Sequence, residues 1–369
     1  MSRASTPPPR RRVPAGLIAA IAAAVIVVAA VAGVFAFALL RPESATVGPA
    51  VASPSTSTSR PTATPTLSPT VSPAPTPTAA STPTPTAPAA PASPAAQGCQ
   101  GSTTVMTVWA HPDDDIIFAN PTISDAIAAG QCVRTVFVTA GDAGKGGGYV
   151  DARELGILRA YNHMRGTDGL WDATELTLNT GMHARRLTPQ NDQRVSVIFL
   201  RLPDGNITGA GFDATGHATL GKLYDGGISS FAPIDGGPAV TRDQLLASVR
   251  EIGTALAPTV TLTHIPRGSA FAPGDHPDHS VVGSIVRDAL SADATVGPGI
   301  RYFVGYPSLD LPRNLDGAVL DAKVDTYRIY TQQDEVIRCA DRSACLKTRK
   351  FGEWLQRSYP KTEAELQFG

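Results

Sequence analysis

The chain has 369 residues, more than one typical domain needs, but its composition is divided unevenly along its length. Residues 1–98 carry six Arg and a single acid, whereas residues 99–369 carry 25 Lys or Arg and 31 Asp or Glu and are mildly acidic. Without runs of Lys or Arg, this larger part lacks the clustered positive charge that binds the phosphates of nucleic acids. Its many apolar runs exclude a fully disordered protein and are enough for one large core.

Residues 15–40 form an uncharged apolar run, AGLIAAIAAAVIVVAAVAGVFAFALL, that follows Arg10, Arg11 and Arg12. About 20 such residues cross a bilayer as a helix. The preceding Arg cluster predicts that the N-terminal side of the run stays in the cytoplasm. We therefore expect a basic cytoplasmic tail at 1–14, an uncleaved anchor in the cell membrane at 15–40 and an extracytoplasmic remainder. A cleaved signal peptide is the alternative, although its apolar region normally runs only about 7 to 15 residues.

The segment from 41 to 98 consists almost wholly of Pro, Thr, Ser and Ala. So few large apolar side chains cannot offset the entropy of ordering the chain. We expect a disordered linker, biased by its prolines toward extended polyproline II, that leads to a single domain at 99–369.

The four cysteines are expected to form two disulfides, which agrees with an exported domain. Cys99 precedes the first expected strand and Cys132 precedes the second, and neighbouring parallel strands bring such positions together. Cys339 and Cys345 bracket a short loop. Because the chain has no CxxC pair, two disulfides are favoured over a thiol catalyst or a cysteine zinc site.

Short apolar runs alternate with helical patterns from residue 105 onwards. Runs that are apolar on both faces and bounded by turn residues predict strands, at 105–110, 133–140, 195–202, 258–265 and 301–306. Helices are expected at 121–130, 151–166, 241–257 with Thr241 as its cap, and 279–290. This alternation predicts a doubly wound, mostly parallel α/β sheet of the Rossmann type. From 307 on, the chain is expected to be helical and pinned by a disulfide.

Two loops rich in His and Asp follow two of these strands. AHPDDD at 110–115 follows the first strand, and GDHPDH at 274–279 follows the strand at 258–265. Doubly wound sheets place their working groups after the carboxyl ends of strands. Adjacent carboxylates repel one another unless a cation lies among them, and two imidazoles with one carboxylate form a ligand set that catalytic zinc uses. Either loop alone is more often a solvated or helix-capping turn, but the pair predicts a divalent metal site.

The two loops resemble the signatures of the PIG-L or LmbE-like zinc-dependent deacetylases, which remove the N-acetyl group from substrates that contain N-acetylglucosamine. AHPDDD and HPDH correspond to the family's (A/P)HPDDE and HxDH loops, and TAGD at 139–142, AREL at 152–155 and LRLPDG at 200–205 are similar as well. The resemblance covers most of residues 103–290. Asp115 stands where the family usually has Glu, and Gly274 stands where some relatives have Tyr, so help for the oxyanion must come from elsewhere.

The resemblance implies one zinc ion, or another divalent metal, with three protein ligands: His111, Asp114 and His279. Asp113 then acts as the general base, taking a proton from a water molecule whose pKa the metal lowers. His276, if protonated, is a second electrophile beside the oxyanion and can protonate the departing amine, and Asp278 orients and charge-stabilises it.

Three further residues are candidates for binding substrate. Arg153 and Asp204 match positions at which relatives contact the sugar and its phosphate or aglycone, and Asp142 is a further pocket candidate. A salt bridge to Glu154 or another acid is the alternative for Arg153, and a turn in PDG is the alternative for Asp204. His264, at the end of a strand, is expected to pack rather than to face the site.

These observations predict a membrane-tethered, extracytoplasmic zinc-dependent deacetylase of an N-acetylglucosamine-type sugar in an envelope glycan or glycoconjugate. Two other classes stay open: a non-catalytic, metal-containing carbohydrate-binding module on a stalk, and a non-haem Fe(II) oxygenase, which the βαβ alternation disfavours. We expect an amino-sugar or glycan partner and no nucleic acid. The sequence does not indicate the acyl group, the oligomeric state or the role of the C-terminal region.

Overall fold

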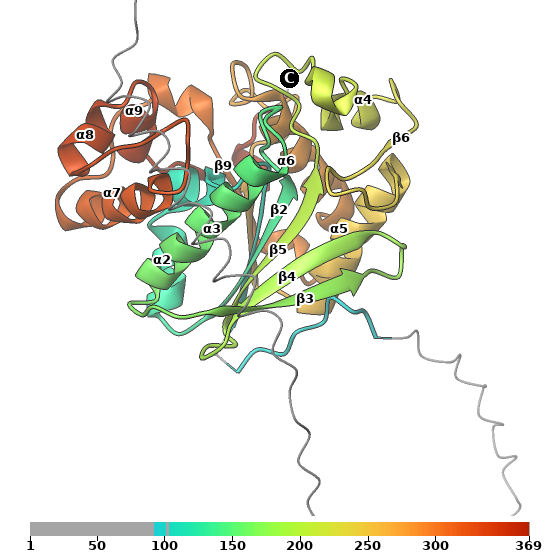
Figure 1. Cartoon of the computed structure of the whole chain (residues 1–369), viewed down its shortest axis with the longest axis horizontal. Coiled ribbons are helices and arrows are strands. Elements are labelled where there is room, and N and C mark those ends of the chain that lie inside the picture. Colours follow the sequence, from blue (N-terminus) through green and yellow to red (C-terminus); the bar gives the residue numbers. More distant parts are fainter. Residues whose placement is uncertain (1–91, 101–102, 369) are drawn as a thin grey trace, which may run out of the picture. The chain divides into compact units, whose positions relative to one another are not determined.

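The computed structural model describes residues 92–100 and 103–368. Their central feature is an eight-stranded sheet with the strand order β10-β9-β8-β1-β2-β5-β4-β3 (Figure 1). Five neighbouring strands are parallel: β9 (Ile300–Phe303), β8 (Val260–His264), β1 (Thr104–Trp109), β2 (Cys132–Thr139) and β5 (Val195–Leu202). Antiparallel strands extend both edges: β10 (Pro360–Lys361) at one edge, β4 (His183–Pro189) and β3 (Trp171–Thr177) at the other.

The parallel strands confirm the five strands that the sequence predicts, and their order confirms the doubly wound sheet. From β5 to β9, the third, second, first, fourth and fifth of these strands along the chain lie side by side. The chain direction across the sheet therefore reverses between β1 and β8. In folds of this kind, ligands bind outside the carboxyl ends of the strands at that reversal.

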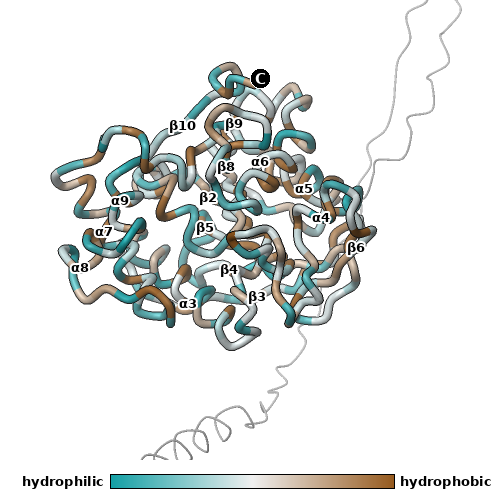
Figure 2. The backbone as a smooth tube through the Cα atoms, turned by 90° about the horizontal axis from the view of Figure 1, so that it is seen from above, coloured by the Kyte–Doolittle hydropathy of each residue, from teal (hydrophilic) through white to brown (hydrophobic). Residues whose placement is uncertain are grey.

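Helices cover the sheet on both faces (Figures 1 and 2). One face carries α2 (Thr122–Ala128), α3 (Gly147–Met164), α7 (Gly317–Thr331), α8 (Arg342–Lys347) and α9 (Phe351–Leu355), and the other carries α4 (Leu220–Tyr224), α5 (Arg242–Leu256) and α6 (Pro277–Leu290). Because side chains alternate along a strand, Met106 and Val108 of β1 join the α5 and α6 core, while Val105 and Trp109 join the other core.

The predicted helices are present, with ends that differ by a few residues. Helix α5 begins as expected at Thr241, whose side chain accepts a hydrogen bond from Gln244 N–H while the Gln244 side chain accepts one from Thr241 N–H. This reciprocal cap satisfies two main-chain donors that the helix itself cannot. The shorter elements are η1 (Asp115–Ala119), η2 (Asp213–Thr215), η3 (Gly297–Gly299), η4 (Tyr306–Asp310), η5 (Glu363–Glu365), β6 (Ser230–Phe231) and β7 (Val240–Thr241).

Both expected disulfides are present, Cys99 with Cys132 and Cys339 with Cys345. The second lies in the C-terminal region, which is largely helical as predicted. It joins the loop after α7 to α8, so it ties together two of the elements that cover one face of the sheet.

Two features of the domain were not predicted. The β3–β4 hairpin was missed because β3, WDATELT, is mostly exposed and polar, and its strand conformation depends on pairing with β4. Residues 92–98, which the sequence places in the linker, lie against the domain: Ala95 is fully buried, and Ser93 Oγ donates a hydrogen bond to Glu251. The part of the chain that packs on the sheet therefore starts before Cys99.

The expected tail at 1–14, the anchor at 15–40 and most of the linker at 41–98 lie outside the described residues. Within 92–100 and 103–368, no helix combines the length and the apolar character that crossing a membrane requires.

Candidate active site

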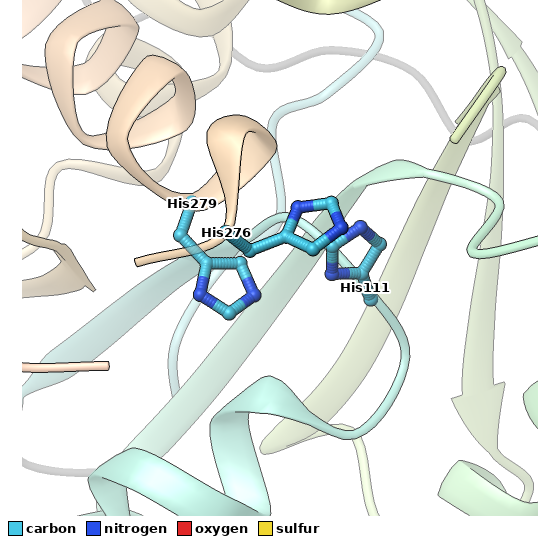
Figure 3. A group of neighbouring side chains, drawn as sticks. All are labelled: His111, His276 and His279. Atoms are coloured by element: carbon cyan, nitrogen blue, oxygen red, sulfur yellow. The ribbon is translucent and has the colours of Figure 1, made fainter. Parts of the chain in front are cut away.

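The two His/Asp loops meet at the reversal point of the sheet. The first loop leaves the carboxyl end of β1, and the second leads from the neighbouring strand β8 into α6. One ring nitrogen each of His111, His276 and His279 lies within 4.8 Å of the others, and all three side chains are buried (Figure 3). The ring centroids of His111 and His279, which are 168 positions apart in the sequence, are 5.2 Å apart. The predicted convergence of the two loops is therefore confirmed.

Asp114 places a buried carboxylate among these imidazoles. Its oxygens lie 3.2 Å from Nδ1 of His111, 3.1 Å from Nε2 of His279 and 3.2 Å from Nε2 of His264. Burial by itself would raise the pKa of Asp114, but the neighbouring His279, His111 and His264 hold it well below its usual value. Asp114 is thus an anion at neutral pH and can serve as a metal ligand.

His279 has the orientation that a metal-binding histidine requires. Its Nδ1 is 2.8 Å from Oδ1 of Asp275, a carboxylate four residues earlier in the sequence. A carboxylate on one ring nitrogen fixes the ring and leaves the other nitrogen free for a metal. Nε2 of His279 faces Asp114 and, although fully buried, has no hydrogen-bond partner among the described residues. This buried, unused nitrogen beside an anion and a second imidazole fits a divalent cation held by the three predicted ligands.

His264 packs beside this group, as expected, and it also contacts one of the predicted ligands. Its ring does stack on His279, with centroids 4.1 Å apart, but its Nε2 also reaches the carboxylate of Asp114. Ligand atoms of Asp114, His264 and His279 lie within 4.8 Å of one another. His264 ends β8, so its approach to the loop after β1 follows from the pairing of these two strands.

His276, which we expected to act as an electrophile if it is protonated, is held as a neutral ring by a hydrogen bond to the main chain. It caps the N-terminus of α6, where its Nδ1 accepts a hydrogen bond of 3.1 Å from the main-chain N–H of Asp278. Burial, followed by the charges of His111 and His279, lowers the pKa of His276 to about 2. With Nδ1 accepting, the ring proton is on Nε2, so His276 can offer a neutral N–H donor.

The carboxylate of Asp278 binds a different partner from the one predicted. It lies 4.0 Å from Nδ1 of His276, but it accepts a hydrogen bond of 2.7 Å from Gly205 N–H and is 3.3 Å from Nε2 of His111. Asp278 therefore orients His111 with its side chain and His276 with its main chain. Gly205 permits this contact, since a Cβ there would lie 2.4 Å from Oδ1 of Asp278.

Asp113 is paired with Arg153. Nη2 of Arg153 is 2.7 Å from Oδ1 of Asp113, and both side chains are buried. Burial raises the pKa of Asp113 to about 6, although the charge of Arg153 opposes the rise. A carboxylate whose pKa lies near neutrality can both accept and release a proton, as a general base requires.

Arg153 lines the cavity and is held there by residues of the C-terminal region. Its Nε donates a hydrogen bond of 2.7 Å to the hydroxyl of Tyr330, and its Nη1 donates one of 2.7 Å to Gly141 O. Tyr330 in turn donates to Asp334, whose carboxylate is 3.6 Å from Nε of Arg153. The salt bridge that the sequence offered as the alternative for Arg153 is present, but its partner is Asp113 and not Glu154. A contact of Arg153 with the sugar stays a prediction.

Asp204 lies beside the site, and Asp142 lies behind Asp204. The carboxylate of Asp204 lies 3.9 Å from Nε2 of His111 and accepts a hydrogen bond of 2.7 Å from Asn206 N–H in the turn that follows. Asp142 accepts a hydrogen bond of 2.9 Å from the main-chain N–H of Asp204. Asp204 thus reaches the pocket, whereas Asp142 supports the loop that carries it.

A cavity of about 150 Å³ opens onto these groups. One part of its lining comes from the predicted loops and their neighbours: His111, Asp113, Asp114, Ile117, Phe118, Tyr149, Arg153, Asp204 and His276. The other part comes from the C-terminal region: Tyr306, Asp334, Val336, Ile337, Phe351 and Trp354. The region to which the sequence assigned no role therefore forms a largely apolar and aromatic wall of the pocket.

Four residues that line or contact the site were not predicted from the sequence. Asp275 stands inside the GDHPDH loop, so its spacing of four from His279 was a usable signal for a supporting carboxylate. His264 ends a strand next to β1, which was a weaker signal. Tyr306 and Asp334 lie outside every motif, and only the three-dimensional packing of the C-terminal region brings them here.

The fold and the site define an α/β protein with a candidate metal centre of His and Asp at the reversal of its sheet. The family model described as PIG-L, GlcNAc-PI de-N-acetylase, matches residues 106–290, half of the chain. The chain belongs to this family, as the two loops predicted, and the C-terminal wall of the pocket lies outside the matched residues. No curated protein sequence matches the chain.

Several solved structures resemble the fold at low sequence identity. The 4-carboxy-2-hydroxymuconate hydratase GalB from Pseudomonas putida KT2440 has a TM-score of 0.38 and 13% identity, over 69% of this chain and 83% of that one. The N,N'-diacetylchitobiose deacetylase from Pyrococcus horikoshii has a TM-score of 0.35 and 13% identity, over 63% and 70%. The zinc-inhibited form of teicoplanin deacetylase Orf2 has a TM-score of 0.39 and 15% identity, over 68% and 90%.

Proposed function

We propose that the protein is a metal-dependent deacetylase that hydrolyses the N-acetyl group of an N-acetylglucosamine-type sugar in an envelope glycan or glycoconjugate. Membership of the PIG-L family supports the reaction class. The single observation that carries the proposal is the buried meeting of His111, Asp114 and His279 beside Asp113, because binding alone does not require a base next to a metal.

We assign the metal, zinc or another divalent cation, to His111, Asp114 and His279. When bound there, such a metal supplies a water molecule of lowered pKa and polarises the amide carbonyl. Asp113 takes the proton from the attacking water, whose oxygen forms a bond to the carbonyl carbon. The C–N bond then breaks, and the proton held by Asp113 passes to the departing nitrogen, so that acetate and a free amine leave.

The remaining groups position the metal ligands and Asp113, and they stabilise the negative charge that develops on the carbonyl oxygen. The Nε2–H of His276 donates to the carbonyl oxygen as it becomes negative. Asp278 and Asp275 fix the rings of His111 and His279. We assign Asp204 to the substrate's hydroxyl groups, since its carboxylate lines the pocket.

The test is the release of acetate from N-acetylated oligosaccharides and envelope glycans incubated with the purified full-length chain. Mass spectrometry is expected to show the loss of one acetyl mass per modified site, and chelated enzyme serves as the control. Binding of the glycan without any loss of acetyl groups would support the carbohydrate-binding alternative and overturn the deacetylase.

We further propose that residues 15–40 anchor the chain in the cell membrane with the domain outside. The uncharged run after three arginines supports this orientation. Reporter fusions after residue 98, one active only in the cytoplasm and one active only outside it, test the proposal. Activity of the cytoplasmic reporter would contradict it.

A further inference from the structure

Hydrolysis of an amide places negative charge on the carbonyl oxygen, so the pocket needs hydrogen-bond donors that are not already in use. Most donors that line the cavity are engaged. Arg153 donates to Tyr330, Gly141 O and Asp113, as described above. The hydroxyl of Tyr149 donates to Asp334, and Nε1 of Trp354 donates to a main-chain oxygen.

Tyr306 is the exception among the tyrosines of this pocket. Its hydroxyl has no hydrogen-bond partner among the described residues, and the side chain lines the cavity. The ring stands edge-on to two site histidines, with centroids 5.0 Å from His279 and 6.1 Å from His276, at interplanar angles of 77° and 83°. The phenol therefore lies beside the groups to which we assign the chemistry.

The position of Tyr306 is fixed on both sides. Its main-chain N–H donates a hydrogen bond of 3.0 Å to Oδ1 of Asp275, the same oxygen that binds His279. Its main-chain oxygen accepts a hydrogen bond of 3.2 Å from Trp354, and its ring stacks on the Trp354 ring with centroids 4.2 Å apart and planes at 9°. A donor held in this way needs no reorganisation when charge develops, which is what makes such donors effective.

An ordinary phenol has a pKa of about 10 and is protonated at neutral pH. The hydroxyl of Tyr306 is therefore available as a donor.

We propose that Tyr306 is a further catalytic residue, whose hydroxyl donates a hydrogen bond to the amide carbonyl oxygen as that oxygen becomes negative. The hydroxyl keeps its proton, and no bond of Tyr306 is made or broken. This inference rests on the proposed deacetylase function and adds to it a donor from outside the residues that match the family model.

The experiment compares the wild type with Tyr306→Phe, which keeps the ring and its stacking on Trp354 and removes only the hydroxyl. We expect kcat for acetate release to fall about 100-fold, with KM changed by no more than about threefold. The affinity for a methylphosphonamide analogue, whose tetrahedral phosphorus imitates the transition state, is expected to fall by a similar factor. The affinity for the free-amine product stays unchanged. Tyr224→Phe is the matched control, since its hydroxyl binds Asp288 on the exposed surface.

The outcomes separate this inference from the proposed function. If the wild type releases no acetate, the deacetylase itself fails. If the wild type is active and Tyr306→Phe keeps kcat within about twofold, the function stands and the role of Tyr306 is overturned. A second variant, Tyr306→His, retains an aromatic ring with an N–H donor and is expected to recover part of kcat. Equal losses in both variants, with unfolding temperatures lower than that of Tyr224→Phe, would show a structural role and contradict the proposal.

Discussion

The pocket is built from two regions of the chain that differ in how they can be recognised. The loops after β1 and β8 lie within the residues that match the PIG-L model and supply His111, Asp113, Asp114 and His279. The region from β9 to the C-terminus lies beyond the match and supplies an aromatic wall together with Asp334, which holds Arg153 against Asp113.

The two regions therefore supply residues with different kinds of role in the site. Groups that hold a metal or move a proton must be of particular types at short spacings, so they leave a motif in the sequence. Groups that hold those residues in place or shape the pocket can come from anywhere that the fold brings near. We therefore expect variants of the first region to remove the chemistry and variants of the second to slow it.

The largest effect is expected for Asp113→Asn, which removes the base but keeps the size of the side chain. Without a proton acceptor, kcat for acetate release should fall by about 10² to 10⁴, while the metal content stays unchanged. The measurement is acetate release together with metal analysis of the same preparation. Asp168→Asn, at an exposed position, is the control. Full activity in Asp113→Asn would remove the proposed mechanism.

A smaller effect is expected for Asp334→Asn in the C-terminal region. The amide keeps an acceptor for Tyr330 but loses the charge that helps to hold Arg153, so the carboxylate of Asp113 is less well placed. We expect kcat to fall about tenfold with little change in KM, and the free energy of unfolding to fall by about 1 to 3 kcal/mol.

The control for this variant is Asp325→Asn, whose ion pair with Arg342 is partly exposed to solvent. It should cost at most about 1 kcal/mol and leave kcat unchanged. If Asp334→Asn raised KM and left kcat unchanged, Asp334 would contact the substrate and would not position Arg153.

The smallest effects on activity are expected from the two disulfides, one near the start of the described domain and one in the C-terminal region. Replacing Cys99 and Cys132 by Ser opens a link with a sequence separation of 33 and should cost about 4 kcal/mol of unfolding free energy without changing kcat. Replacing Cys339 and Cys345 opens a link with a separation of 6 and should cost about 2 kcal/mol.

Only the second pair is expected to lower activity, by about threefold, because the pocket wall at Val336 and Ile337 directly precedes Cys339. Denaturant unfolding and acetate release measure the two effects separately. If activity fell only when Cys99 and Cys132 were replaced, the result would contradict the link between the C-terminal disulfide and the pocket wall.

The sequence predicted the parts of the fold that have a strong local pattern. The five parallel strands are apolar on both faces, and Thr241 caps its helix as expected. The β3 strand has no such pattern, because it is exposed at the edge of the sheet and is ordered only by its partner. The same limit applies to residues 92–98, whose burial depends on the surface that receives Ala95.

For the site, the sequence predicted which residues meet but not all of their contacts. The convergence of His111 with His279 followed from two strand-end loops. The pairing of Asp278 with His111 rather than His276 depends on the position of Gly205, which no local pattern fixes. Tyr306 and Asp334 were not predictable, because their neighbours in the sequence carry no motif and only the packing of the C-terminal region brings them to the pocket.

The most direct test of this account is the metal content of the purified full-length chain and of its His279→Ala variant. If His111, Asp114 and His279 hold one divalent ion, the wild type should contain one metal ion per chain, the variant should lose it, and Asp113→Asn should retain it. A wild type without bound divalent metal, or a His279→Ala variant with the same content as the wild type, would contradict the account.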